Sequence, residues 1–202
     1  MKKIIIPLFI LFSSCYCKEP IKSPKELSKP VIYVKVIYIQ PLGDVNIEYL
    51  KIVKNSVESF YGFKCVIKDK VPLTTDLLAA SRIRYDAGKI LSKFNTNENL
   101  LILTEKDIAC RKNQYPEWGI LGLGYRPGTT CVVSTFRMKR NVSKLIIIDR
   151  LKKVAIHEIG HNLGLDHCEN DIHCLMNDAR GTIKQVDTEK IWLCSKCWNL
   201  IK

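Results

Sequence analysis

A histidine-rich motif near the carboxyl end of the chain has the residue types and spacing of a catalytic metal site. Residues 157–167 read HEIGHNLGLDH. On a helix, His157 and His161 lie one turn apart on the same face, so both imidazoles can reach one metal ion. Glu158 is rotated by roughly 100° around the helix axis from His157. It therefore points beside the metal and is the candidate general base.

A third ligand is expected just beyond this helix. Gly164 can end the helix in the left-handed conformation and turn the chain back, which delivers His167 to the metal. Three protein ligands leave the fourth position of a zinc ion to water. Zinc lowers the pKa of such a water to roughly 7 and polarises a peptide carbonyl. The alternative is an accidental set of histidines on a buried helix face, and the added Glu, Gly and third His disfavour it.

A second set of metal-binding residue types begins directly after His167. It consists of Cys168, Cys174, Cys194 and Cys197. One Cys-x-x-Cys pair and one more widely spaced pair have the composition of a closed, tetrahedral zinc site, which would fasten a loop-rich tail. Because four thiolates already fill a tetrahedron, we expect His173 to be a solvated loop residue, with a role as substitute ligand as the alternative.

The order of these motifs resembles the signature of one peptidase family. The histidine motif is followed at once by Cys168, then by Cys174-Leu175-Met176, and after 17 further residues by Cys194-Ser195-Lys196-Cys197. This arrangement is similar to that of the archaemetzincins, zinc metallopeptidases of the metzincin clan. It spans about the last quarter of the chain. Five residues separate Cys168 from Cys174, one more than is usual in the family.

The resemblance implies a fold and a function. The fold is of the α/β class, a metzincin-like zincin with a twisted, mixed, mainly parallel sheet, an active-site helix and a small carboxyl-terminal subdomain held by the four cysteines. Two zinc ions per chain are expected, one catalytic and one structural. The expected activity is hydrolysis of peptide bonds, with narrow specificity and aminopeptidase character as one option. Met176 is expected to form the tight turn beneath the catalytic metal, or else to be an ordinary core methionine.

Other functions fit the sequence less well. A catalytically quiet, zinc-binding envelope lipoprotein that acts as a peptide-binding module is the main alternative, and the intact Glu158 counts against it. The net charge of +12 is spread along the chain in short groups. No motif combines aromatic and basic residues, so we expect no nucleic-acid partner. The expected partners are a peptide or protein substrate and a membrane, and the expected state is a monomer.

The amino-terminal residues indicate export. Residues 1–14 have the charged start and short apolar run of a signal peptide. Cys15 resembles the cysteine that is lipidated in bacterial lipoproteins, and residues 15–30 read as an anchor and tether rich in Pro and Lys. We expect a membrane-anchored lipoprotein of the bacterial cell envelope, with a periplasmic or secreted protein as the alternative. Residues 31–202 then form one peptidase domain.

The remaining cysteines of the domain are Cys65, Cys110 and Cys131. Exported proteins meet oxidising conditions, yet the spacing of the second set favours metal over disulfides. We expect these three to be buried as small hydrophobic residues, and a bridge between Cys110 and Cys131 stays open as an alternative.

Strand and helix patterns alternate along the domain. Runs rich in apolar and β-branched residues predict strands at 31–40, 63–68, 100–104 and 129–138. Helical spacing of apolar residues predicts helices from Asp44 to Gly62, over 83–94, and from 144 into the histidine motif, with Leu145 on its apolar face. This order favours mainly parallel strands. By resemblance to metzincins, 129–138 is expected to be the antiparallel edge strand that borders the cleft, with an ordinary covered strand as the alternative. The glycine-rich segment 118–128 is not expected to bind a nucleotide, because no helix follows it.

The predicted anchor can be tested directly. Replacing Cys15 with Ser should move the protein from the membrane fraction to the soluble exported fraction, because the acyl chains would be attached to this residue. Cell fractionation and the mass of the mature amino terminus measure this change. Unchanged partitioning, with no fatty-acyl mass on the unaltered protein, would remove the lipoprotein hypothesis.

Overall fold

The computed structural model of the chain describes residues 35–179 and 182–201. The expected signal peptide, Cys15 and the tether lie outside these residues. In the described ranges, no helix has the length and apolar character needed to cross a membrane.

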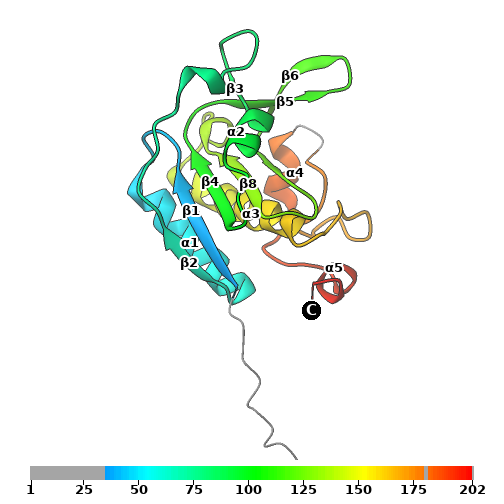
Figure 1. Cartoon of the computed structure of the whole chain (residues 1–202). Coiled ribbons are helices and arrows are strands. Elements are labelled where there is room, and N and C mark those ends of the chain that lie inside the picture. The colour runs from blue at the N-terminus through cyan, green and yellow to red at the C-terminus, as the bar shows by residue number, and fades with distance from the viewer. Residues whose placement is uncertain (1–34, 180–181, 202) are drawn as a thin grey trace, which may run out of the picture. The chain divides into compact units, whose positions relative to one another are not determined.

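A five-stranded sheet forms the centre of the domain (Figure 1). Its spatial order is β2 (Lys64–Ile67), β1 (Val36–Pro41), β4 (Asn99–Thr104), β8 (Thr130–Ser134) and β7 (Gly122–Gly124). The first four strands are parallel, and β7 runs antiparallel to β8. The prediction of a mixed, mainly parallel sheet is therefore confirmed.

Five helices lie in the described ranges, and three of them cover the faces of this sheet. The five are α1 (Ile47–Tyr61), α2 (Ala87–Lys93), α3 (Lys144–Asn162), α4 (Ile183–Thr188) and α5 (Ser195–Asn199). Two short 3-10 turns lie at Thr75–Leu77 and Phe136–Met138. Helices α1 and α3 pack on one face, and α2 packs on the other.

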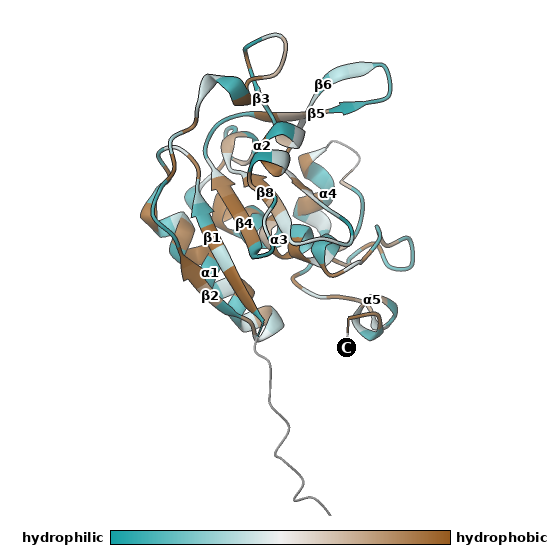
Figure 2. Ribbon diagram, in the orientation of Figure 1, coloured by the Kyte–Doolittle hydropathy of each residue, from teal (hydrophilic) through white to brown (hydrophobic). Residues whose placement is uncertain are grey.

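The central strand β4 is buried on both faces, because successive side chains point to opposite sides of a strand. Leu101 and Leu103 contribute to the core beneath α1 and α3, whereas Leu100 and Ile102 contribute to the core beneath α2. Figure 2 shows β4 as a continuous apolar strand between the helices. This double burial explains why residues 100–104 read as an unbroken hydrophobic run.

A second, three-stranded sheet was not predicted. Its order is β3 (Tyr85–Asp86), β5 (Ile108–Lys112) and β6 (Tyr115–Ile120), with β5 and β6 antiparallel. Strand β6 reads YPEWGI, in which a proline, a glutamate and a glycine interrupt any alternating apolar pattern. The periodicity of apolar residues therefore does not predict strand β6.

The expected position of the edge strand is wrong. The segment at 129–138 contains β8, whose residues are all buried between β4 and β7, so the alternative of an ordinary covered strand is the correct one. The antiparallel edge strand is β7, within the glycine-rich segment 118–128, for which no strand was predicted. Glycine weakens a strand and carries no side chain to pack, so a Gly-Leu-Gly strand has no pattern of its own.

Helix α1 ends as predicted and begins two residues later than expected. Gly62 adopts the left-handed conformation with φ of 70° and closes the helix. The amino-terminal cap is Asn46 and not Asp44, because the Asn46 side chain accepts a hydrogen bond from the Glu48 N–H at 2.9 Å.

The helix expected over 83–94 is shorter than predicted. It begins at Ala87, where the Asp86 side chain accepts a hydrogen bond from the Lys89 N–H. The preceding residues pair with β5, and Ile83 is 78% exposed. Pairing with a distant strand has overridden the local helical spacing in this segment.

Helix α3 is the scaffold of the histidine motif. Leu145, expected on its apolar face, is 77% exposed, and the buried face starts at Ile147. From Leu151 onward nearly every residue is buried, because the helix lies between the sheet and the carboxyl-terminal segment. That segment has its own small core, formed by the four cysteines together with Ile156, Leu165, Leu175, Met176 and Leu193.

Candidate active site and metal centres

The end of α3 and the loop after it bring the three predicted histidines together. His157, His161 and His167 each offer a ring nitrogen, and these atoms lie within 4.8 Å of one another. The ring centroids of His161 and His167 are 4.9 Å apart. Gly164 has a φ of 98°, so the chain reverses at the predicted residue and places His167 beside the other two.

Backbone carbonyls orient two of the three imidazoles. The Nδ1 atom of His157 lies 2.7 Å from the Leu175 oxygen, and that of His161 lies 2.8 Å from the Leu165 oxygen. A carbonyl oxygen only accepts, so Nδ1 carries the proton and Nε2 is left with a lone pair. This is the arrangement of metal-binding histidines, whose second ring nitrogen donates to a protein group.

Burial also favours the uncharged, metal-binding form of these rings. Desolvation lowers the pKa of His157 to about 3 and also lowers the pKa of His161. A cluster of three neutral imidazoles with converging nitrogens fits zinc, which is commonly bound by three histidines in catalytic sites. The residues present therefore suit the metal that the motif implies.

The Glu158 carboxylate lies between α3 and the edge strand β7. Glu158 is only 6% exposed, and burial raises the pKa of its carboxyl group to about 8. A Cβ atom on Gly122 would be 2.5 Å from Glu158 Oε1 and 2.7 Å from its Cγ. Only a glycine at this place in β7 leaves room for the carboxylate, and sequence reasoning missed this role of Gly122.

A large cleft runs across the histidine cluster. Its volume is about 1220 Å³, and its lining includes the three histidines and Glu158. Strands β6 and β7 contribute residues 118–124 to the lining, and the segment after Met176 contributes residues from Asn177 to Glu189.

The four predicted cysteines form a separate, buried cluster. The sulfur atoms of Cys168 and Cys194 are 3.6 Å apart, and those of Cys174 and Cys197 are 3.8 Å apart. These distances exceed the ~2.05 Å of a disulfide bond. They match the ~3.8 Å edge of a tetrahedron with Zn–S bonds of ~2.3 Å. The backbone N–H groups of Asn170 and Cys194 donate to Cys168 and Cys174 at 3.4 Å, as expected for sulfurs with thiolate character.

The two clusters are joined by a short turn. Leu175, whose carbonyl oxygen binds His157, lies between Cys174 and Met176 in sequence. Met176 is fully buried, and a Cβ atom on Gly160 would be 2.5 Å from its sulfur. The predicted methionine turn thus packs directly against α3 between the first two histidines.

The other candidate residues lie outside both clusters. His173 is exposed, and its Nδ1 is 3.3 Å from the Thr188 oxygen. Cys65 and Cys131 are buried and Cys110 is partly buried, as expected for small hydrophobic residues. All three are free thiols, so the alternative of a bridge between Cys110 and Cys131 is wrong.

A mixed sheet, a helix that ends in a three-histidine cluster and a methionine turn beneath it together define a metzincin-type zinc metallopeptidase. The model of Peptidase family M54 matches residues 48–202, and the chain belongs to this family, the archaemetzincins. The confirmed resemblance therefore covers most of the domain and not only its last quarter.

The relatives agree with this assignment. The chain is 32% identical over 173 residues to the archaemetzincin of Methanocaldococcus jannaschii, covering 83% of this chain and 93% of that protein. It is 29% identical over 170 residues to that of Halobacterium salinarum, covering 79% and 95%. The crystal structure of the Archaeoglobus fulgidus archaemetzincin complexed with malonate matches with a TM-score of 0.72 at 29% identity, covering 82% and 99%. The Methanopyrus kandleri structure shares the fold, with a TM-score of 0.68 at 23% identity and coverage of 83% and 93%.

The tight fit of Gly122 against Glu158 yields a first prediction. Gly122→Ala should leave the fold and the metal content intact, because Glu158 can rotate away from the new methyl group. Turnover of a peptide that the parent cleaves should fall by roughly 10²-fold, as is typical when a catalytic group moves by ~1 Å. Gly88→Ala, in α2 and outside the cleft lining, is the matched control and should keep parental turnover. Equal turnover in Gly122→Ala and the parent would show that Glu158 does not depend on this glycine.

The two clusters predict the metal content. Elemental analysis of protein folded in zinc should give two zinc ions per chain, and one ion or none would contradict the ligand assignment. Cys197→Ser should lower the melting temperature more than His167→Ala does, because a closed structural site contributes folding free energy directly. We expect a decrease of roughly 10 °C or more for Cys197→Ser, since ~1 kcal/mol shifts Tm by ~2–4 °C in a domain of this size. A strong chelator should reproduce the loss in calorimetry.

Proposed function

We propose that the protein hydrolyses peptide bonds in the cleft at the end of α3. His157, His161 and His167 hold a zinc ion, and Glu158 is the general base. The observation that carries this proposal is the buried carboxylate of Glu158 beside three converging imidazoles. Zinc, when bound, acts as a Lewis acid on the scissile carbonyl and makes water a nucleophile near neutral pH.

Glu158 performs the proton transfers. It follows His157 directly but is not part of the ligand cluster. A zinc ion on the histidines would lower the raised pKa of its carboxyl group, so that the ionised carboxylate takes a proton from the attacking water. It then returns the proton to the leaving amine. Contact with β7 fixes the position of the carboxylate, which reduces the entropy cost of reaching the reactive arrangement.

Strand β7 is proposed to bind the backbone of the substrate. One of its sides pairs with β8, and β7 is the last strand of the five-stranded sheet. Residues 122–124 line the cleft, so an extended peptide can add to the sheet beside Glu158. Main-chain hydrogen bonds then hold the peptide without regard to its side chains. We therefore assign the pairing with substrate backbone, which was expected of 129–138, to β7.

The finer parts of the proposal rest on family resemblance and on the amino-terminal sequence. They are aminopeptidase-like cleavage with narrow specificity, a second, structural zinc ion on the four cysteines, and export to the cell envelope through a lipid anchor at Cys15. The converging thiols support the second zinc. A catalytically quiet peptide-binding module is disfavoured, because such a protein has no need of a buried carboxylate beside the metal ligands.

A digest of short-peptide libraries tests the proposed activity. Peptides with free amino termini should be cleaved by the zinc-loaded protein and not after treatment with a chelator. Libraries with acetylated amino termini separate the two kinds of peptidase, because an aminopeptidase leaves them intact.

Glu158→Gln tests the proposed base. It should retain zinc and fold while turnover falls by ~10²–10⁴-fold, the usual contribution of general acid–base catalysis. Glu98→Gln, in a partly exposed ion pair with Lys68 outside the cleft lining, is the matched control and should leave turnover unchanged. If Glu158→Gln cleaves a good substrate as fast as the parent at equal metal content, the proposed mechanism is wrong.

A further inference from the structure

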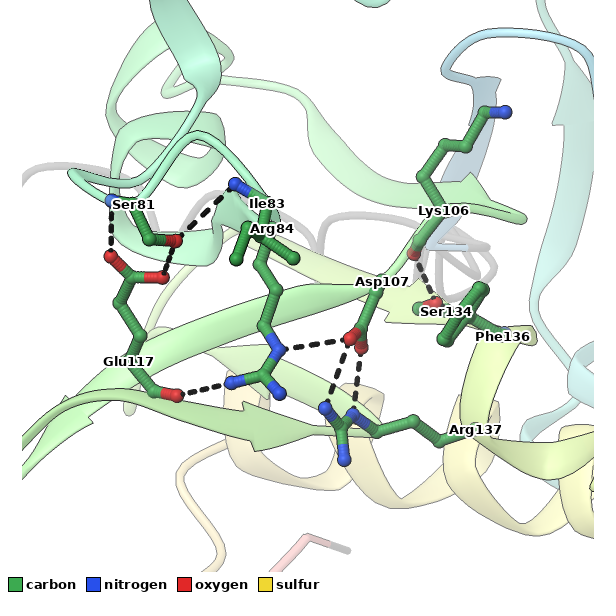
Figure 3. Close-up of polar contacts among 9 residues, drawn as sticks. All are labelled: Ser81, Ile83, Arg84, Lys106, Asp107, Glu117, Ser134, Phe136 and Arg137. Carbon is green, nitrogen blue, oxygen red and sulfur yellow. Dashed lines mark hydrogen bonds and ion pairs between the residues drawn. The ribbon is translucent and has the colours of Figure 1, made fainter.

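A group of charged side chains on the cleft wall is not used by the proposed hydrolysis. Asp107 accepts hydrogen bonds from two arginines (Figure 3). Arg137 binds it with two nitrogens, Nε at 2.7 Å and Nη2 at 2.9 Å, and Arg84 Nε binds it at 3.0 Å. All three residues line the same cleft as His157 and Glu158.

The group places two guanidinium groups around a single hydrogen-bonded carboxylate. One carboxylate faces two guanidinium groups, and guanidinium stays charged at any pH of interest. The nearby Glu117 offers Arg84 only its backbone oxygen, at 2.8 Å. The Glu117 carboxylate instead accepts hydrogen bonds from the backbone N–H and the hydroxyl of Ser81. Arg84 contributes to lowering the pKa of the Glu117 carboxyl group, so Glu117 offsets part of the positive charge, but among the described residues only Asp107 forms a salt bridge with either arginine.

Each arginine also keeps an unused donor group. Among the described residues, Arg84 Nη2 and Arg137 Nη1 take part in none of the hydrogen bonds of this group. Figure 3 shows these two nitrogens on the same side of the group, pointing away from Asp107. Both side chains remain about one-third exposed, whereas that of Asp107 is only 13% exposed. Asp107 is therefore the buried acceptor that positions both guanidinium groups. The remaining donors, Nη2 of Arg84 and Nη1 of Arg137, belong to residues that line the cleft.

Strand β6 makes room for this arrangement. A Cβ atom on Gly119 would lie 2.0 Å from Cζ of Arg137, so the guanidinium rests directly on the strand. A planar guanidinium fixed in this way loses little entropy when it binds a ligand. Lys112 and Arg140 line the cleft as well and add positive charge to it.

We propose that Arg84 and Arg137 form a carboxylate-binding subsite for the peptide substrate. The inference rests on the proposed peptidase function and adds a substrate class to it. Paired guanidinium donors suit the two oxygens of a carboxylate. The carboxylate belongs either to an acidic side chain or to the free carboxyl terminus of the peptide. The narrow specificity expected for the protein is then, in part, a requirement for a negative charge at a fixed distance from the scissile bond.

Binding to the zinc-loaded Glu158→Gln protein tests the subsite without turnover. The probes are two hexapeptide libraries of equal composition, one with free and one with amidated carboxyl termini. Retained peptides are identified by mass spectrometry. Because hydrogen bonds between two charged groups are stronger than those between neutral groups, we expect an enrichment of roughly 10-fold or more. Enrichment of Asp and Glu in both libraries identifies a side-chain carboxylate, and enrichment of free over amidated peptides identifies a terminal one.

Variants in the same background show whether the arginines cause the enrichment. Arg137→Gln and Arg84→Gln should each reduce it several-fold, and Arg137→Lys should keep part of it because the charge remains. Arg111→Gln is the matched control, since Arg111 is exposed and does not line the cleft. Melting temperatures and zinc contents show that each variant is folded.

The outcomes separate this inference from the proposed function. Peptides retained without carboxylate enrichment, or enrichment that persists in both arginine-to-glutamine variants, would overturn the subsite while cleavage by the parent still supports a peptidase. Retention of no peptide at all would also count against the subsite. Arginine-dependent enrichment with no cleavage by the parent would instead leave the subsite standing and overturn the peptidase function.

Discussion

The carbonyl oxygen of Leu175 is the constraint on which the histidine site depends most directly. It holds the proton on Nδ1 of His157 and so turns the other nitrogen toward the metal position. Leu175 has little freedom of its own, because Cys174 precedes it and the buried Met176 follows it. A metal on the four cysteines would hold Cys174 in place, and with it the Leu175 carbonyl that orients the imidazole of His157. This provides a physical reason for placing a structural cluster beside a catalytic one.

Glycines in the cleft wall serve a comparable purpose. Gly122 leaves space for the Glu158 carboxylate, and Gly119 leaves space for the Arg137 guanidinium. Each glycine in a strand costs roughly 0.5–1 kcal/mol relative to alanine. The cost is small beside the ~10²-fold rate effect of a misplaced catalytic group. Gly122 and Gly119 therefore destabilise their strands slightly, and in return they leave space for Glu158 and Arg137 in the same cleft.

Local patterns predicted the parts of the structure that are encoded locally. The histidine and cysteine sets, the reversal at Gly164 and the end of α1 at Gly62 depend on spacing within a few residues or on the conformation of a single glycine. The edge strand β7 and the group around Asp107 depend on contacts between distant segments. Their only signal was a glycine-rich stretch, which also fits a loop. The assignments to the amino-terminal residues, including Cys15, stay predictions.

We propose that the chain holds two chemically different zinc centres, one closed by four sulfurs and one open on three nitrogens. Zinc X-ray absorption spectroscopy on the purified protein tests this most directly. Averaged over two such ions, the first shell should contain about two sulfurs at ~2.3 Å and about two nitrogen or oxygen atoms at ~2.0–2.1 Å per zinc. A shell made only of sulfur, or only of nitrogen and oxygen, would show that the two centres do not both bind zinc.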